Sequence, residues 1–202
     1  MKKHIFVLVV SIFGASPAYS SEVLTGDIRL ACEALLCLSS GTRPDACAAS
    51  LSRYFSIQRR RFSNTLRARL NFLNLCPVAN QTPEMQALVV AIRDGAGRCD
   101  AQFLNQTLIQ QRTREVCPTW RHSDHTCRTE TIRVIDDTQP VYCAIYDNHE
   151  YTSDVGARYV GTPENGGYWV DSLDFERALT EYNANLAAEA EQEGNFSLQF
   201  RR

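Results

Sequence analysis

Eight cysteines are the residues of this sequence with the widest chemical range. A cysteine side chain can form a disulfide, bind a metal ion as a thiolate or act as a nucleophile, and the redox compartment decides which use is favoured. The start of the chain therefore matters first, because it predicts the compartment. The eight are Cys32, Cys37, Cys47, Cys76, Cys99, Cys117, Cys127 and Cys143.

Residues 1–20 have the pattern of a cleaved secretory signal peptide. Two lysines give a basic start, and residues 5–13 form an apolar run that is too short to span a bilayer. Ala18 and Ser20 are small residues three places and one place before the expected cut, which follows Ser20. No later run is long and apolar enough for a spanning helix, so an integral membrane protein is not expected. The sequence predicts export to the periplasm, where the eight thiols are expected to form disulfides.

Helix geometry restricts which cysteines can pair. Cys32 and Cys37 lie on one expected helix, with their side chains about 140° apart around its axis. They cannot readily bond to each other, because a disulfide needs Cα atoms within about 7 Å. Cys37 and Cys47 are symmetric about the turn between two expected helices, so we expect them to pair. Cys32 would then reach Cys76 or Cys99. The cysteines left to link the strand-rich part include Cys117, Cys127 and Cys143.

Residues 117–127 support a competing interpretation, because His122 and His125 lie between the two cysteines that end this segment. Cysteine and histidine are zinc ligand types, but the spacing lacks the paired C-x₂₋₄-C units of zinc ribbons and fingers. A zinc-binding periplasmic protein is kept as an alternative, and the main expectation is no metal and no cofactor. The absence of a C-x-x-C motif from the sequence argues against a thiol redox enzyme.

The sequence contains no recognisable catalytic motif: there is no G-x-S-x-G, no H-E-x-x-H and no P-loop. Glu33 is a candidate for the single acid of a peptidoglycan-modifying enzyme, although an isolated glutamate on a helix is more often a surface or ion-paired carboxylate. We therefore expect a protein that is not an enzyme and has no small-molecule substrate. A peptidoglycan-modifying envelope enzyme is the alternative.

Two short segments are candidates for binding a partner. Arg59, Arg60 and Arg61 form the densest positive patch, which is either a docking patch or a solvated loop. Tyr168 and Trp169 are either exposed anchors or the apolar plug of a small sheet. After the signal peptide the chain has 19 arginines, no lysine and 23 acidic residues, which gives a net charge of −4. That balance argues against a nucleic-acid-binding protein, whose footprint is usually basic.

Residues 21–116 are expected to form a helical, cysteine-rich domain. The clearest helix follows Thr82, a capping residue, and Pro83, which suits the first helical position. Its apolar residues recur at i, i+3, i+4 and i+7, which favours a helix with one buried face. The expected helices cover residues 27–38, 44–55, 63–76, 83–94 and 100–114.

Residues 117–193 are expected to form a smaller, strand-containing segment with a C-terminal helix. The pattern predicts strands over residues 129–135, 141–146, 159–160 and 168–170, then a helix from residue 171 or 172 to about 190. Residues 194–202 are expected to be a flexible tail. The predicted fold class is mainly α, with a disulfide-stabilised helical N-terminal part and a small α+β C-terminal part.

One stretch of the chain resembles a known family. Residues 24–47 read LTGDIRLACEALLCLSSGTRPDAC, which fixes two cysteines, a loop and a third cysteine together. The likeness continues through residues 50–55, 59–61, 72–77 and 95–100. In these features the chain resembles the TrbM family of plasmid conjugal-transfer proteins, over roughly residues 24 to 105.

The resemblance implies a periplasmic accessory of a type IV secretion system that acts in mating-pair formation. It supplies no catalytic residues, which agrees with the absence of a recognisable active-site motif. The expected partners are envelope or secretion-system components, and nucleic acid is not expected. The expected work of the protein is to bind another envelope component.

Overall fold

The protein is described by a computed structural model that covers residues 24–117 and 127–199. The expected signal peptide and its cut after Ser20 lie outside these residues, as do His122 and His125. No helix in these two ranges is both long enough and apolar enough to cross a membrane.

Five α-helices form the N-terminal part, and four of them confirm the sequence prediction. Their bounds are α1 (Gly26–Leu38), α2 (Ala48–Phe55), α3 (Phe62–Leu73), α4 (Pro83–Gly95) and α5 (Ala101–Thr107). The Thr82 hydroxyl accepts a hydrogen bond from the Met85 N–H at 3.2 Å, as expected of an N-cap. The apolar face of α4 is buried, with Leu88, Val89 and Ile92 at most 2% exposed. Helix α4 therefore forms where capping and periodicity agree.

The core lies between these helices and extends into α6 (Val141–Asp147). Helix α1 contributes Leu35 and Leu38, and Tyr54 of α2 is fully buried. Helix α6 packs on α4, where the Tyr146 ring fills the space beside Gly95 and a β-carbon at that glycine would lie 2.5 Å from the ring. The Tyr146 hydroxyl donates a hydrogen bond to the Leu38 carbonyl, so α6 is tied to the end of α1.

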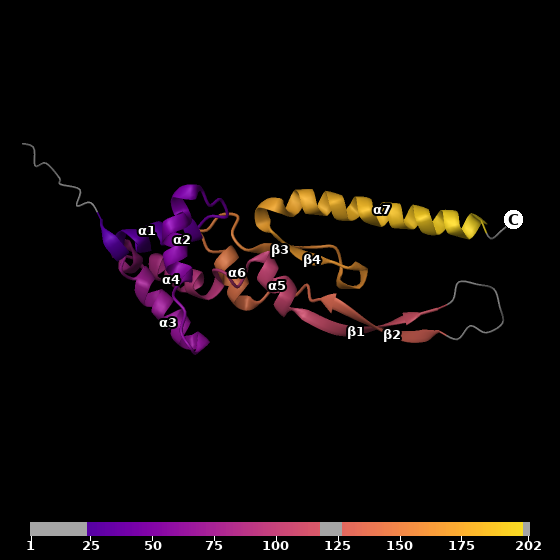
Figure 1. Ribbon diagram of the computed structural model, residues 1–202, viewed down its shortest axis with the longest axis horizontal. Helices are drawn as coiled ribbons and strands as arrows, with labels where there is room; N and C mark the ends of the chain where they lie inside the picture. The colour runs from indigo at the N-terminus through magenta and orange to yellow at the C-terminus, as the bar shows by residue number, and fades with distance from the viewer. Residues whose placement is uncertain (1–23, 118–126, 200–202) are drawn as a thin grey trace, which may run out of the picture.

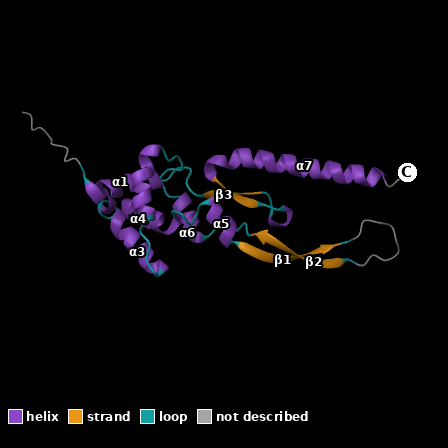
Figure 2. Cartoon of the chain, viewed as in Figure 1, coloured by secondary structure: helices purple, strands orange, loops and turns teal. Residues whose placement is uncertain are grey.

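The remaining elements are two antiparallel pairs of strands and one long helix. Strand β1 (Ile109–Val116) pairs with β2 (Arg128–Ile135), and β3 (Ala157–Val160) pairs with β4 (Tyr168–Asp171). Helix α7 (Phe175–Gln199) follows. In Figure 1 the β1–β2 hairpin and the distal half of α7 extend in the same direction, away from α1–α4. Figure 2 shows α1, α3 and α4 at one end of the view and the β1–β2 hairpin toward the other, with α7 extending in the direction of the hairpin.

Two sequence predictions of secondary structure were wrong. Residues 141–146 were predicted as a strand and form α6, because Cys143 and Tyr146, three residues apart, are both buried on one helical face. The two β-branched residues of this segment, Val141 and Ile145, are exposed. The helix predicted over residues 100–114 ends at Thr107, since the next residues pair with β2. Tertiary contacts override local propensity in both places.

Four disulfides are present, and they confirm the expected use of the cysteines. Cys37 bonds to Cys47 as predicted, and Cys32 bonds to Cys76, one of its two expected partners. Cys99 bonds to Cys143 and therefore joins the N-terminal helices to α6. Cys117 bonds to Cys127 across the far end of the hairpin. The fold class is confirmed: mainly helical, cross-linked, with small two-stranded sheets in the C-terminal part.

The buried core crosses the boundary that the sequence suggested at residues 116 and 117. That position falls at the end of β1, and residues on both sides of it, such as Leu104 and Tyr146, belong to one buried cluster. Helix α7 runs through Gln199, so it includes most of the expected tail at residues 194–202.

Candidate functional site: a basic docking groove

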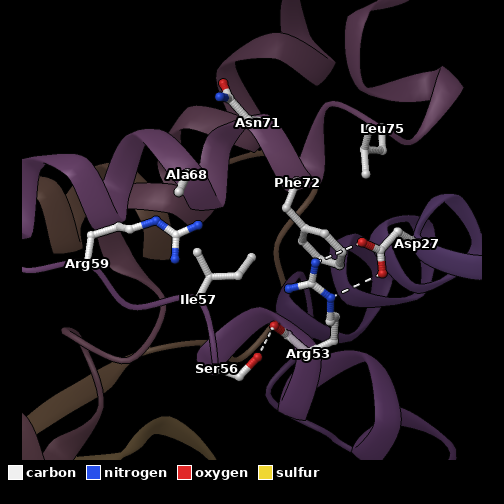
Figure 3. Close-up of a pocket in the computed structure, with 9 residues that line it drawn as sticks. All are labelled: Asp27, Arg53, Ser56, Ile57, Arg59, Ala68, Asn71, Phe72 and Leu75. Atoms are coloured by element: carbon white, nitrogen blue, oxygen red, sulfur yellow. Dashed lines mark hydrogen bonds and ion pairs between the residues drawn. The ribbon is translucent and has the colours of Figure 1, made fainter.

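A groove lies between α1, α2 and α3, next to one of the segments that the sequence singled out (Figure 3). Its volume is about 310 Å³. Ile57 and Phe72 form an apolar floor, each at most 6% exposed, and Leu75 at the rim is 43% exposed. We call this the docking groove. It is lined by Asp27, Arg53, Ser56, Ile57, Arg59, Ala68, Asn71, Phe72 and Leu75.

An ion pair fixes one wall of the docking groove. Arg53 donates two hydrogen bonds to the Asp27 carboxylate, at 3.1 and 2.7 Å, which joins α2 to the first turn of α1 (Figure 3). The same guanidinium lies 5.0 Å from the centre of the Phe72 ring, in cation–π contact. The bonds from Arg53 lower the pKa of Asp27 below its usual value. Asp27 is the one carboxylate among the lining residues, so the groove suits binding better than proton transfer near neutral pH.

The loop before α3 carries Arg59, Arg60 and Arg61, and a threonine holds its backbone. The Arg59 N–H donates to the Thr65 hydroxyl at 2.8 Å, and that hydroxyl donates back to the Arg59 carbonyl at 3.4 Å. All three arginine side chains are exposed, and none forms an ion pair with a residue in the described ranges. We call residues 59–61 the arginine loop. Of its three residues, Arg59 lines the docking groove.

The charge around the docking groove is one-sided over a much longer segment than the arginine loop. Residues 46–83 contain six arginines and no aspartate or glutamate, although acids outnumber arginines in the chain that follows the signal. Three adjacent arginines are plain in the sequence, but this acid-free segment was not predicted from it. A count of charge in a sliding window would have found it. The six are Arg53, Arg59, Arg60, Arg61, Arg67 and Arg69.

Arg69 adds an inward-facing cation to this segment. Its residue is only 9% exposed, and its guanidinium lies 4.9 Å from the Tyr54 ring and 5.4 Å from the Phe55 ring. Its Nε has no hydrogen-bond partner in the described structure. Burial raises the pKa of Tyr54 to about 12, so this ring stays neutral. Two aromatic faces therefore contact the Arg69 cation in the place that a carboxylate often takes.

The second pair of candidate partner-binding residues lies elsewhere and is largely enclosed. Trp169 is 3% exposed, and its indole N–H donates to the Asp136 carbonyl at 3.0 Å. The Asn105 side chain bonds both the N–H and the carbonyl of Trp169, each at 2.8 Å. Tyr168 is half-buried. The burial of Trp169 fits the apolar plug, one of the two roles that the sequence left open.

The residues behind the two alternative functions are engaged in other contacts. Glu33 is ion-paired with Arg29, one helical turn away, at 2.8 Å. It lines neither the docking groove nor the acidic cavity described next. The sulfur atoms of Cys117 and Cys127 are bonded to each other, so neither is available as a thiolate ligand for zinc.

A second cavity, of about 300 Å³, has the opposite charge. Its lining includes Asp100, Asp154, Asp171 and Asp174, with Arg43 as the one cation. Burial raises the pKa of Asp100, and Arg43 opposes that shift. The two cavities therefore differ in charge: acidic residues predominate in the lining of the second, and arginines predominate around the docking groove.

Comparisons with known proteins give one match. The family model described as TrbM, a family of conjugal-transfer proteins, matches residues 23–183. No curated protein and no solved structure matches the chain.

Proposed function

The chain belongs to the TrbM family, which gives it a role in conjugal transfer, and we propose that it serves mating-pair formation as a non-enzymatic accessory protein in the periplasm. Its work is to bind another envelope component through the docking groove and the arginine loop. The observation that carries this proposal is the acid-free segment at residues 46–83, which supplies most of the lining of an apolar groove and carries the exposed arginine loop beside it.

The chemistry of the groove defines the partner. An apolar floor next to exposed arginines fits a segment that presents an apolar side chain flanked by aspartate or glutamate. Arginine pairs with carboxylates through two parallel hydrogen bonds, so it gives orientation as well as attraction. The partner is therefore an acidic protein segment of the envelope or of the type IV secretion system. Four disulfides and the expected signal peptide support a periplasmic site of action.

Charge reversal of the arginine loop tests the proposed contact. The variant with Arg59, Arg60 and Arg61 all changed to Glu is expected to lower the mating frequency by about a hundredfold. The new glutamates would face the acidic residues of the partner, and like charges that face each other at an interface cost several kcal/mol. The matched control changes the same three residues to Lys, which keeps the charge and should lose far less. Both variants should keep the four disulfides and the unfolding midpoint of the wild type. Normal mating by the Glu variant would contradict the proposal.

The location is tested separately by mass spectrometry without reductant. The protein recovered from a periplasmic extract should lack residues 1–20 and should weigh eight hydrogens less than the fully reduced chain, since four disulfides are formed. Recovery from the cytosol with the leader uncut and all thiols reactive to an alkylating agent would contradict export.

A further inference from the structure

The β1–β2 hairpin is reinforced far beyond what the core of the protein requires. Of its sixteen paired residues, Val134 is the one that is buried. An isolated two-stranded ribbon is marginally stable in water, yet this one has eight uninterrupted pairs and a disulfide at its end. The hairpin projects away from α1–α4 (Figure 1). The reinforced part of the hairpin therefore lies outside the core.

One outer edge of this ribbon is open. The Asp136 N–H donates to the Leu108 carbonyl at 2.8 Å, and these two residues continue the register of the hairpin. Hydrogen-bonded and non-hydrogen-bonded pairs alternate in an antiparallel ladder. The backbone N–H and C=O groups of Gln111, Thr113 and Glu115 therefore point away from β2.

The outer edge of β2 is partly covered by other residues, whereas the outer edge of β1 is open. The Tyr159 hydroxyl donates to the outward carbonyl of Ile135 at 2.7 Å, and the turn at Pro163–Asn165 packs against β2. Strand β1 has neither cover within the described ranges, and all of Gln111, Thr113 and Glu115 are exposed. It also lacks the proline or bulge that commonly protects an edge strand.

Charge decides what can pair with β1. Antiparallel pairing of two copies, centred on Thr113, would set Arg112 of one copy opposite Arg114 of the other, and like charges directly opposed are destabilising. An acidic strand avoids this conflict. Arg112 already contacts Asp136 and Glu164, and Arg114 contacts Glu130. A guanidinium has five donors, so both arginines keep donors for a further carboxylate.

We propose that the outer edge of β1 is a strand-addition site for an extended segment of a partner protein that carries acidic residues at alternate positions. The backbone groups of Gln111, Thr113 and Glu115 would pair with the added strand, and Arg112 and Arg114 would select its side chains. This contact uses no residue of the docking groove and goes beyond the proposed function.

The test compares two threonines that face each other across the hairpin. Thr113 and Thr131 form one pair of the register, both are exposed, and both have outward N–H groups. Thr113→Pro closes the β1 edge and Thr131→Pro closes the β2 edge, and neither substitution removes a bond between the strands. Retention of four disulfides and of slow exchange at the cross-strand amides of Arg112 and Arg114 shows that the hairpin stays paired in both variants.

The probes are two synthetic octapeptides, (Thr-Glu)₄ and (Thr-Arg)₄, and the readout is amide hydrogen exchange by NMR. The acidic peptide is expected to slow exchange of the Gln111, Thr113 and Glu115 amides by about tenfold or more, and the basic peptide is not. Thr113→Pro should abolish the slowing at Gln111 and Glu115, and Thr131→Pro should preserve it. Slowing by neither peptide, equal slowing by both, or equal loss in both variants would overturn the proposal.

Discussion

Two disulfides with the same spacing serve two very different regions of this protein. Cys37–Cys47 and Cys117–Cys127 each join residues ten positions apart. The first lies in the helical body, defined here as α1–α6, where Cys47 is 5% exposed. The second lies at the end of the β1–β2 hairpin, where Cys117 is exposed. The comparison teaches that a cross-link stabilises whatever unit it closes: the whole core in one case, and a projecting ribbon in the other.

The largest effect is expected from the disulfide that holds α6 in the helical body. Cys99 and Cys143 are both fully buried and lie 44 residues apart. Changing both to Ala should lower the free energy of unfolding by about 4 kcal/mol, because the unfolded chain gains the freedom of that loop. Urea unfolding monitored by circular dichroism measures this. An unchanged midpoint would mean that this cross-link does not restrict the unfolded chain as the chain-entropy argument requires.

The next largest effect is expected from the two disulfides of equal spacing, Cys37–Cys47 and Cys117–Cys127, and it tests whether they stabilise different regions. The chain-entropy argument assigns about 3 kcal/mol to each loop. Changing Cys37 and Cys47 to Ala should lower the global unfolding midpoint accordingly. Changing Cys117 and Cys127 to Ala should leave that midpoint almost unchanged and speed amide exchange in β1 and β2 alone. Equal losses of global stability would show that the hairpin unfolds together with the body.

A smaller, pH-dependent effect is expected from Asp147, a carboxylate of the body. Burial raises its pKa to about 7 from the usual 3.8, with a hydrogen bond from Gln139 acting in the opposite direction. Its other oxygen has no hydrogen-bond partner in the described structure and faces Gly156.

Because the folded chain holds this proton more tightly than the unfolded chain does, protonation of Asp147 stabilises the fold. That stabilisation is complete below pH 4 and is lost as the pH rises through 7. Asp147→Asn should therefore flatten the dependence of the unfolding free energy on pH between 4 and 8. A variant that keeps the slope of the wild type would assign the titration to another group.

Much of the helical body could be predicted from the sequence, because capping and periodicity agree there. Thr82 and Pro83 begin α4 as expected, and the spacing of Cys37 and Cys47 identified their bond. Helix α6 could not be predicted, since its helical form depends on a distant glycine, Gly95, and a distant cysteine, Cys99. Local preference carries no information about such contacts.

The candidate site was predicted only in part. Adjacent arginines are visible in a sequence, so the arginine loop was found, with Arg59 in the groove. The floor was missed, because Ile57 and Phe72 come from separate segments that only folding brings together. The role of Trp169 was left open for the same reason: its burial depends on Asn105 and Asp136.

The most direct test of the docking groove compares the mating frequencies of two matched variants. Leu75 lines the groove and is 43% exposed, and Val78 lies outside it and is 42% exposed. Leu75→Glu places a negative charge where the proposed acidic partner binds, so mating should fall by about tenfold or more. Val78→Glu adds the same charge to an equally exposed apolar position and should mate like the wild type. Equal mating by the two variants, whether normal or impaired, would contradict the groove as the partner-binding site.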